Sequence, residues 1–197
     1  LGDVFRGTKG IMMDMFRRPD KVMAACEKLL PIMIDSAVAS AKRTGVMRVF
    51  IPLHKGLDGF MSDQQFHKFY WPHMKELLNA LIREGITPWV LVEGACNTRL
   101  EAFRDVPPGK VLYHFEATDI FRAKEMMKDR CCIRGNVPAT LLSVGAPEDV
   151  KAYCKKLIDV CGEGGGYIMD ASTTLSDAKV ENVQAMYDFT KEYGVYN

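Results

Sequence analysis

The sequence lacks an excess of charge of either sign, since 26 Lys and Arg stand against 25 Asp and Glu in 197 residues. A near-neutral chain has no electrostatic footprint for nucleic acid or an anionic membrane, so we expect neither as a partner. The sequence also lacks an apolar run near the roughly 20 residues that cross a bilayer, and its first residues lack the apolar core of a signal peptide. No CxxC pair occurs among its six cysteines, which we interpret as reduced thiols of a cytoplasmic protein.

What the sequence does contain is a repeated pattern in which an apolar segment leads into a polar or glycine-rich corner and then toward a helix. The predicted strands are 46–53, 87–92, 110–115, 131–134 and 167–169, and the corners are 54–56, 93–97, 116–119, 134–138 and 170–173. Helical periodicity or end signals cover 20–43, 62–84, 100–104, 119–130, 147–161 and 178–193. Such repeats predict an α/β fold with a parallel sheet.

A closed (β/α)₈ barrel takes about 250 residues. We therefore expect a TIM-barrel fold of which this chain covers about the last five β/α units, in a single domain over 1–197. Ser62 and Gln65 match a capping box at the start of the helix over 62–84, and Pro72 predicts a break within that helix.

The corners hold the candidate functional residues, because parallel sheets gather their chemistry at the carboxyl ends of strands. Alternation along 110–115 places His114 and Glu116 on one face and Tyr113 and Phe115 on the other. The side chains expected to converge are His54, Glu93, Cys96, His114, Glu116 and Asp170. Such a set favours either a zinc site with three protein ligands or a pair of carboxylates that divide acid and base roles. For His114 the alternative is a hydrogen-bonded core histidine.

Four motifs resemble the C-terminal half of the uroporphyrinogen decarboxylase superfamily. They are Gly135-Asn136-Val137-Pro138, Gly145-Ala146-Pro147-Glu148-Asp149-Val150, Gly164-Gly165-Gly166-Tyr167-Ile168 and Glu181-Asn182-Val183, within a resemblance over about 46–197. The superfamily includes uroporphyrinogen decarboxylase and the zinc-dependent methyltransferases that serve corrinoid proteins and coenzyme M. The resemblance implies a (β/α)₈ barrel and an enzyme.

Two departures from the motifs of well-known members indicate which branch of the superfamily this chain resembles. The decarboxylase has Gly-His-Gly after its final strand, whereas this chain has Asp170-Ala171-Ser172-Thr173-Thr174. The thiol-methylating enzymes have His-x-Cys after a strand, whereas here that corner begins with Glu93 and its cysteine is Cys96. His54, Glu93-Gly94 and the segment 115–119 are more similar to the O-demethylase-type methyltransferases, whose zinc sites are rich in carboxylates.

The resemblance therefore implies a zinc-dependent methyltransferase that moves a methyl group from a small methylated substrate to a corrinoid protein. We expect catalytic roles for Glu93, Glu116 and Asp170, substrate contacts from His54, Asn136 and Asp119, and metal ligation by Glu93, Glu116, His114 and Cys96. The alternatives are a tetrapyrrole decarboxylase of porphyrin biosynthesis and a non-catalytic barrel fragment that acts as a binding module. The open sheet edges of a partial barrel predict a partner, either the N-terminal half of the barrel or a second copy of the chain.

Overall fold

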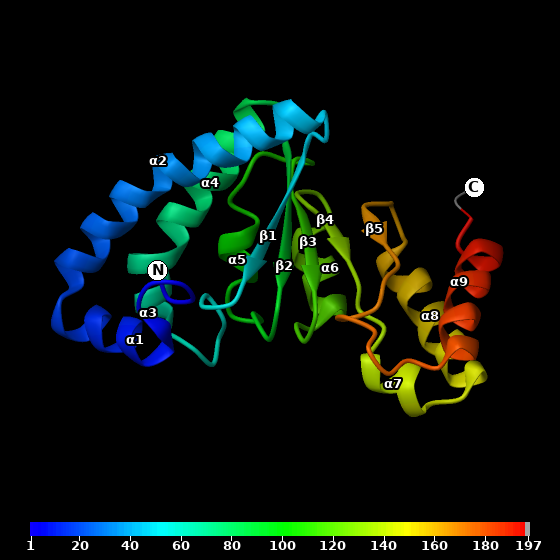
Figure 1. Cartoon of the computed structure of the whole chain (residues 1–197). Helices are drawn as coiled ribbons and strands as arrows, with labels where there is room; N and C mark the ends of the chain where they lie inside the picture. The colour runs from blue at the N-terminus through cyan, green and yellow to red at the C-terminus, as the bar shows by residue number, and fades with distance from the viewer. Residues whose placement is uncertain (196–197) are drawn as a thin grey trace.

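Five strands form one parallel sheet in the computed structural model of this chain, which describes residues 1–195 (Figure 1). The strands are β1 (Arg48–Leu53), β2 (Thr87–Val92), β3 (Leu112–Phe115), β4 (Cys132–Arg134) and β5 (Tyr167–Ile168), and they are neighbours in chain order. This order confirms the predicted α/β class, since consecutive parallel strands joined by helical crossovers are the repeat of a β/α barrel. The last two residues of the predicted domain 1–197 lie outside the described residues.

Helices precede and connect the strands. They are α1 (Gly7–Arg17), α2 (Pro19–Thr44), α3 (Asp63–Gln65), a π-helical turn (Phe66–Tyr70), α4 (Trp71–Arg83), α5 (Leu100–Phe103), α6 (Ile120–Met127), α7 (Ala139–Val144), α8 (Pro147–Cys161) and α9 (Val180–Tyr193). In Figure 1, α2 and α4 lie together beyond β1, and α8 and α9 lie together beyond β5. No helix within residues 1–195 is long and apolar enough to cross a bilayer.

The helical segment after β1 corrects one expectation. Its capping box is confirmed, because the Ser62 side chain accepts a bond from the Gln65 N–H and the Gln65 side chain accepts one from the Ser62 N–H. Pro72 does not break the segment. It lies in the first turn of α4, where a missing N–H costs little, and the π-helical turn before it lets the Trp71 N–H reach the Phe66 carbonyl.

The two faces of the sheet differ in burial along β1, β2 and β4, whereas all four residues of β3 are buried. Tyr113 and Phe115 are fully buried in the core cluster that includes residues of the surrounding helices. The other face, which we call the open face, carries side chains in register across the strands, namely Phe50, Trp89, Leu91, His114, Arg134 and Ile168. Phe50 is 49% exposed and Ile168 43% exposed, so this face has no complete cover of its own.

Asn182 joins the last helix to the loop after β4. It is fully buried on α9, and its Nδ2 donates to the carbonyl oxygens of Leu142 and Gly145, each at 3.0 Å. These carbonyls belong to the end of α7, where backbone acceptors have no intrahelical partner. The Asn182 amide thus gives the Gly145 carbonyl a donor and the Leu142 carbonyl a second one, since Leu142 also accepts the Lys179 N–H at 3.0 Å.

We expect Asn182→Ala to lower the free energy of unfolding by about 1–3 kcal/mol, because the Gly145 carbonyl would lose the donor from Asn182, although the Leu142 carbonyl would keep the Lys179 N–H. The measurement is urea unfolding of the variant and the parent chain. Gln184→Ala is the control, since the side chain of exposed Gln184 bonds to exposed Asp188 on the same helix, and it should change stability by less than about 0.5 kcal/mol. Equal losses in both variants would contradict the role of the buried amide.

Candidate functional site

The carboxyl ends of the five strands meet at one edge of the sheet, as parallel strands must. His54 follows β1, Glu93 follows β2, Glu116 follows β3 and Asp170 lies two residues after the end of β5. The register aligns Leu53 with Val92 and Val92 with Phe115, so the first three corners begin at the same level. This edge is the candidate functional site.

A histidine and a carboxylate touch across the first two corners. His54 Nε2 pairs with Glu93 Oε2, and His54 Nδ1 lies 3.3 Å from Asp3 Oδ2, so the imidazole sits between two carboxylates. The side chains of His54 and Glu93 are each about one-third exposed. Burial raises the pKa of the Asp3 carboxyl, but hydrogen bonds from Lys55 and His54 outweigh it and hold that pKa below its ordinary value. The site therefore holds a histidine between two partly exposed carboxylates.

A second charged pair lies on the far side of the site. The Arg134 guanidinium pairs with Asp170 and lies 4.5 Å from the centre of the Trp89 ring. Asp170 also accepts the N–H of Ala171 at 2.8 Å. Asp170 was predicted as a site residue, but Arg134 and Trp89 were not. The signal for Arg134 was its position as the last residue of β4, on the same face as His114.

His114 is a buried histidine with one free ring nitrogen. Its Nε2–H donates to the Ala171 carbonyl at 2.9 Å, and its Nδ1 is buried with no hydrogen-bond partner within residues 1–195. Burial lowers the pKa of this imidazole more than its contact with Ala171 and the charge of Asp170 raise it. The ring is therefore held as the neutral form with Nδ1 as an acceptor.

Cys96 does not face the other corner residues, contrary to expectation. Its side chain is fully buried, its Sγ lies 3.8 Å from the Gly56 carbonyl oxygen, and its backbone N–H donates to Thr118 at 3.0 Å. Burial raises the pKa of the thiol to about 12. The turn at Gly94, with a φ of +142°, leads the chain back under the corner, which explains the inward position.

Within residues 1–195 no group of three or more His, Cys, Asp or Glu side chains is arranged so that it could hold a metal ion. The predicted donor set of Glu93, Glu116, His114 and Cys96 is therefore not assembled. The physical reasons are the burial of Cys96 and the bond of His114 Nε2 to a backbone carbonyl. His54 and Glu93 are two predicted site residues whose side chains the fold does bring into contact.

Asn136 and Asp119, predicted as substrate contacts, both have bonds within the protein. The Asn136 amide is buried, and its Nδ2 donates to the carbonyl oxygens of Thr118 at 3.1 Å and Glu116 at 3.4 Å. The Asp119 carboxylate accepts the N–H groups of Phe121 and Arg122 at the start of α6. These bonds hold the third corner in place, and contact with a substrate stays a prediction for both residues.

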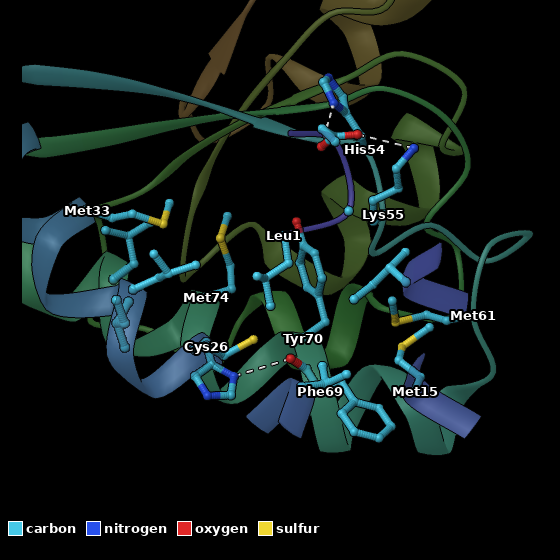
Figure 2. A pocket seen from close by; sticks show the side chains of 18 of the residues that line it. Leu1, Met15, Cys26, Met33, His54, Lys55, Met61, Phe69, Tyr70 and Met74 are labelled. Atoms are coloured by element: carbon cyan, nitrogen blue, oxygen red, sulfur yellow. Dashed lines mark hydrogen bonds and ion pairs between the residues drawn. The ribbon is translucent and has the colours of Figure 1, made fainter. Parts of the chain in front are cut away.

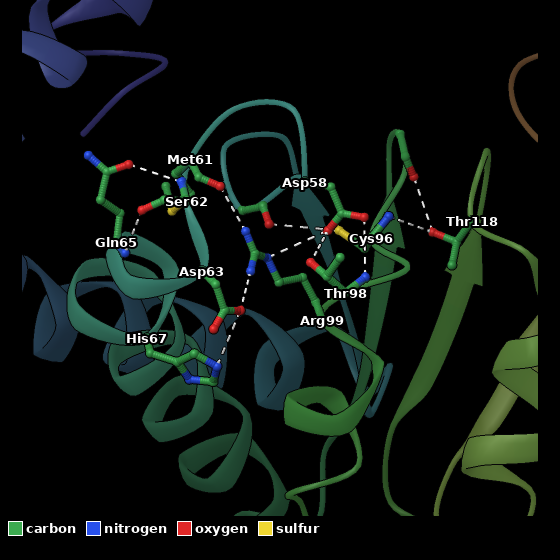
Figure 3. A network of polar contacts seen from close by, with 12 residues as sticks. Asp58, Met61, Ser62, Asp63, Gln65, His67, Cys96, Thr98, Arg99 and Thr118 are labelled. Carbon is green, nitrogen blue, oxygen red and sulfur yellow. Dashed lines mark hydrogen bonds and ion pairs between the residues drawn. The ribbon is translucent and has the colours of Figure 1, made fainter.

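A buried arginine that the sequence analysis did not identify ties the first two corners together (Figure 3). Arg99 is 2% exposed, and its guanidinium pairs with Asp63, donates to the Met61 carbonyl at 2.8 Å and lies 3.6 Å from Asp58. It also lies 4.6 Å from the centre of the Phe66 ring. Because Arg99 follows the Glu93 corner and its partners follow His54, the network fixes the distance between the two loops.

The Asp58 carboxylate strengthens the same connection. It accepts the Thr98 hydroxyl at 2.8 Å and the Thr98 N–H at 3.2 Å. The backbone N–H of Asp58 donates to the Ala95 carbonyl at 2.9 Å. The His54–Glu93 pair thus rests on two loops that are bonded to each other at several points.

Comparison with known proteins shows the family to which this chain belongs. The family model described as uroporphyrinogen decarboxylase (URO-D) matches residues 2–193. The chain is 26% identical over 184 residues to a uroporphyrinogen decarboxylase of Chlorobium phaeovibrioides, covering 90% of this chain and 51% of that protein. It is 27% identical over 137 residues to one of Chlorobium luteolum, covering 67% of this chain and 38% of that protein. The chain thus spans about half the length of the first of these relatives and less of the second.

Among solved structures, a methyltransferase from Methanosarcina mazei has a similar fold, with a TM-score of 0.79. It shares 18% sequence identity, and the match covers 95% of this chain and 54% of that one. At this identity the likeness establishes the fold. From the family match and the parallel sheet together, this chain belongs to the uroporphyrinogen decarboxylase family of enzymes and forms part of its (β/α)₈ barrel.

Proposed function

We propose that this protein is a methyltransferase of its family that takes a methyl group from a small methylated substrate and passes it to a corrinoid held by a partner protein. The fold of the Methanosarcina mazei methyltransferase supports this choice, together with the charges at the corners. The curated relatives' name, uroporphyrinogen decarboxylase, supports the second candidate, a decarboxylase that acts on a tetrapyrrole.

The observation that carries the first choice is that cations at the site are already paired. Lys55 pairs with Asp3, Arg99 with Asp63, and Arg134 with Asp170. A tetrapyrrole with many carboxylates needs cations that are free to bind them, since each of its buried charges needs a partner. Paired cations and an aromatic open face suit a substrate with little charge.

The His54–Glu93 pair supplies the proton that the reaction requires. A corrinoid would supply the nucleophile that accepts the methyl group. As the methyl carbon leaves, both electrons of the carbon–oxygen bond stay on the substrate oxygen. One ring nitrogen of His54 exchanges its carboxylate partner for that oxygen and gives it a proton, while the other nitrogen stays on its carboxylate, which orients the ring.

Zinc, which the family resemblance implies, does not fit the described residues. A catalytic zinc takes three protein ligands. Among the described residues, the predicted donor Glu93 touches His54, which was predicted as a substrate contact, so zinc binding would need further donors. The proton transfer above uses the residues of this chain alone.

The partly exposed open face and the edge strand β1 support a third proposal, that the sheet continues in a partner. Phe50 and Ile168 on that face are nearly half exposed. The partner would be the N-terminal half of the barrel or a second copy of the chain. Such a pairing would protect the unpaired backbone groups of the edge.

The experiment is an anaerobic assay with methoxybenzene as methyl donor and free cob(I)alamin as acceptor. We expect phenol to form and the cob(I)alamin absorbance to fall, both in proportion to protein. The parallel assay supplies uroporphyrinogen and measures released carbon dioxide. Release of carbon dioxide without phenol formation would overturn the methyltransferase proposal and support the decarboxylase.

A further inference from the structure

A cavity of about 260 Å³ lies between α1, α2, β1 and α4, next to the first corner (Figure 2). Its walls are formed by apolar side chains of all four elements, among them Val22, Leu29, Ile51 and Leu77. An engineered apolar cavity of about 150 Å³ binds benzene. The volume therefore suits one substituted ring or a short aliphatic chain, and it is too small for four linked pyrroles.

Sulfur-bearing side chains line much of the cavity. Met15, Cys26, Met33, Met61 and Met74 come from both sides of it, as Figure 2 shows. Methionine is unbranched and polarizable, adapts to irregular shapes, and makes favourable contacts with aromatic rings. Such walls fit an aromatic or aliphatic body without requiring one particular outline.

One end of the cavity is polar and belongs to the candidate site. His54 and Lys55 lie there, and the Tyr70 hydroxyl points toward that end in Figure 2. Burial raises the pKa of the Tyr70 phenol above its ordinary value, so it is a hydrogen-bond donor at neutral pH. The Lys55 ammonium is held by Asp3, so the polar end presents little free charge.

We propose that this cavity binds the apolar body of a small, uncharged molecule, with an oxygen of that molecule beside His54 and the Tyr70 hydroxyl. The inference rests on the proposed function and deepens it, because it makes the methyl donor a compact apolar ether. The cavity places the body between helices, and its polar end places the oxygen where the His54–Glu93 pair can reach it.

The first test is calorimetric titration with methoxybenzene, without any methyl acceptor. Met33→Trp places a larger side chain in the cavity wall. Because Met33 is 54% exposed, we expect this substitution to change the free energy of unfolding little. Ile32→Trp is the matched control, since Ile32 is the neighbouring residue, is 60% exposed and does not line the cavity. We expect the parent and Ile32→Trp to bind alike and Met33→Trp to bind at least about ten-fold more weakly, which corresponds to 1.4 kcal/mol. Benzene-1,3,5-tricarboxylate, with the same ring and three charges, should not bind.

The second test locates the ligand through Cys26. Methoxybenzene should slow alkylation of Cys26 by N-ethylmaleimide at least about three-fold, since half-buried Cys26 lines the cavity. Cys132 is also half-buried, lies on β4 away from the cavity, and should react at an unchanged rate.

The inference is overturned by absence of binding, by equal binding to Met33→Trp and the parent, or by unchanged Cys26 alkylation. Circular dichroism of each variant verifies that the fold is retained before titration. Because no methyl acceptor is present, loss of binding tests this cavity alone. Binding without phenol formation in the anaerobic assay would instead contradict the proposed function and leave the cavity as a ligand site.

Discussion

Arg99→Met is expected to lower the free energy of unfolding by about 1–3 kcal/mol, because it removes the buried guanidinium and its hydrogen bonds, while the side chain of its partner Asp63 is 67% exposed and stays hydrated. Asp58 would lose the cation beside it, and the Met61 carbonyl would lose a donor. Methionine keeps much of the length and apolar stem of arginine, so the loss reports the guanidinium rather than a large cavity. Urea unfolding of the variant against the parent chain measures the difference.

Arg104→Met is the matched control for that experiment. Arg99 directly precedes the short helix α5, and Arg104 directly follows it. The Arg104 side chain is 35% exposed and lies 3.7 Å from exposed Glu101. Exposed ion pairs of this kind contribute about 0–1 kcal/mol. If both variants lost the same stability, Arg99 would have no special role in joining the two corners.

His54→Gln should slow phenol formation in the anaerobic assay by about 10²- to 10⁴-fold, the range that general acid catalysis contributes. Glutamine retains a polar side chain that can bond Glu93 but cannot deliver a proton. The apparent affinity for methoxybenzene should change much less than the rate, because His54 lies at the polar end of the cavity and the apolar side chains that hold the ring are unchanged. Single-turnover rates and the calorimetric titration separate these two quantities.

His67→Gln is the control for His54, because His67 is 53% exposed on the π-helical turn and does not line the cavity. It should leave the rate unchanged within about two-fold, since the substitution lies away from the reacting groups. If His54→Gln were as active as the parent, that result would contradict the proposed proton transfer from His54. A variant that loses binding and rate together would make His54 a binding residue rather than a proton donor.

Local pattern predicted most of the fold, for reasons of covalent geometry. All five strands were found, because apolar runs bounded by glycine and polar corners have few other stable conformations. α1 and α7 were missed, since α1 has no side-chain cap at its start and α7 has only six residues. The expected break at Pro72 was wrong. Pro72 lies in the first turn of α4, directly after a π-helical turn, so its missing N–H interrupts no helix, and no propensity rule signals such a turn.

The candidate site was predicted in part. The chain pattern located the corners, and two of the corner side chains, His54 and Glu93, do meet. Whether Cys96 faces outward depended on the direction of the turn at Gly94, and that direction follows from packing beneath the corner. Sequence spacing carries no such information.

The sequence by itself determined the order of strands and corners, the family, and the alternation that separates Tyr113 from His114. These properties follow from near-neighbour periodicity and motif order along one chain. Only the tertiary structure decided that Arg99 joins two corners, that Arg134 pairs with Asp170, and that a cavity lies beside His54. Each of these contacts joins residues about 35 or more positions apart, and which distant side chains meet is set by how helices pack on a sheet.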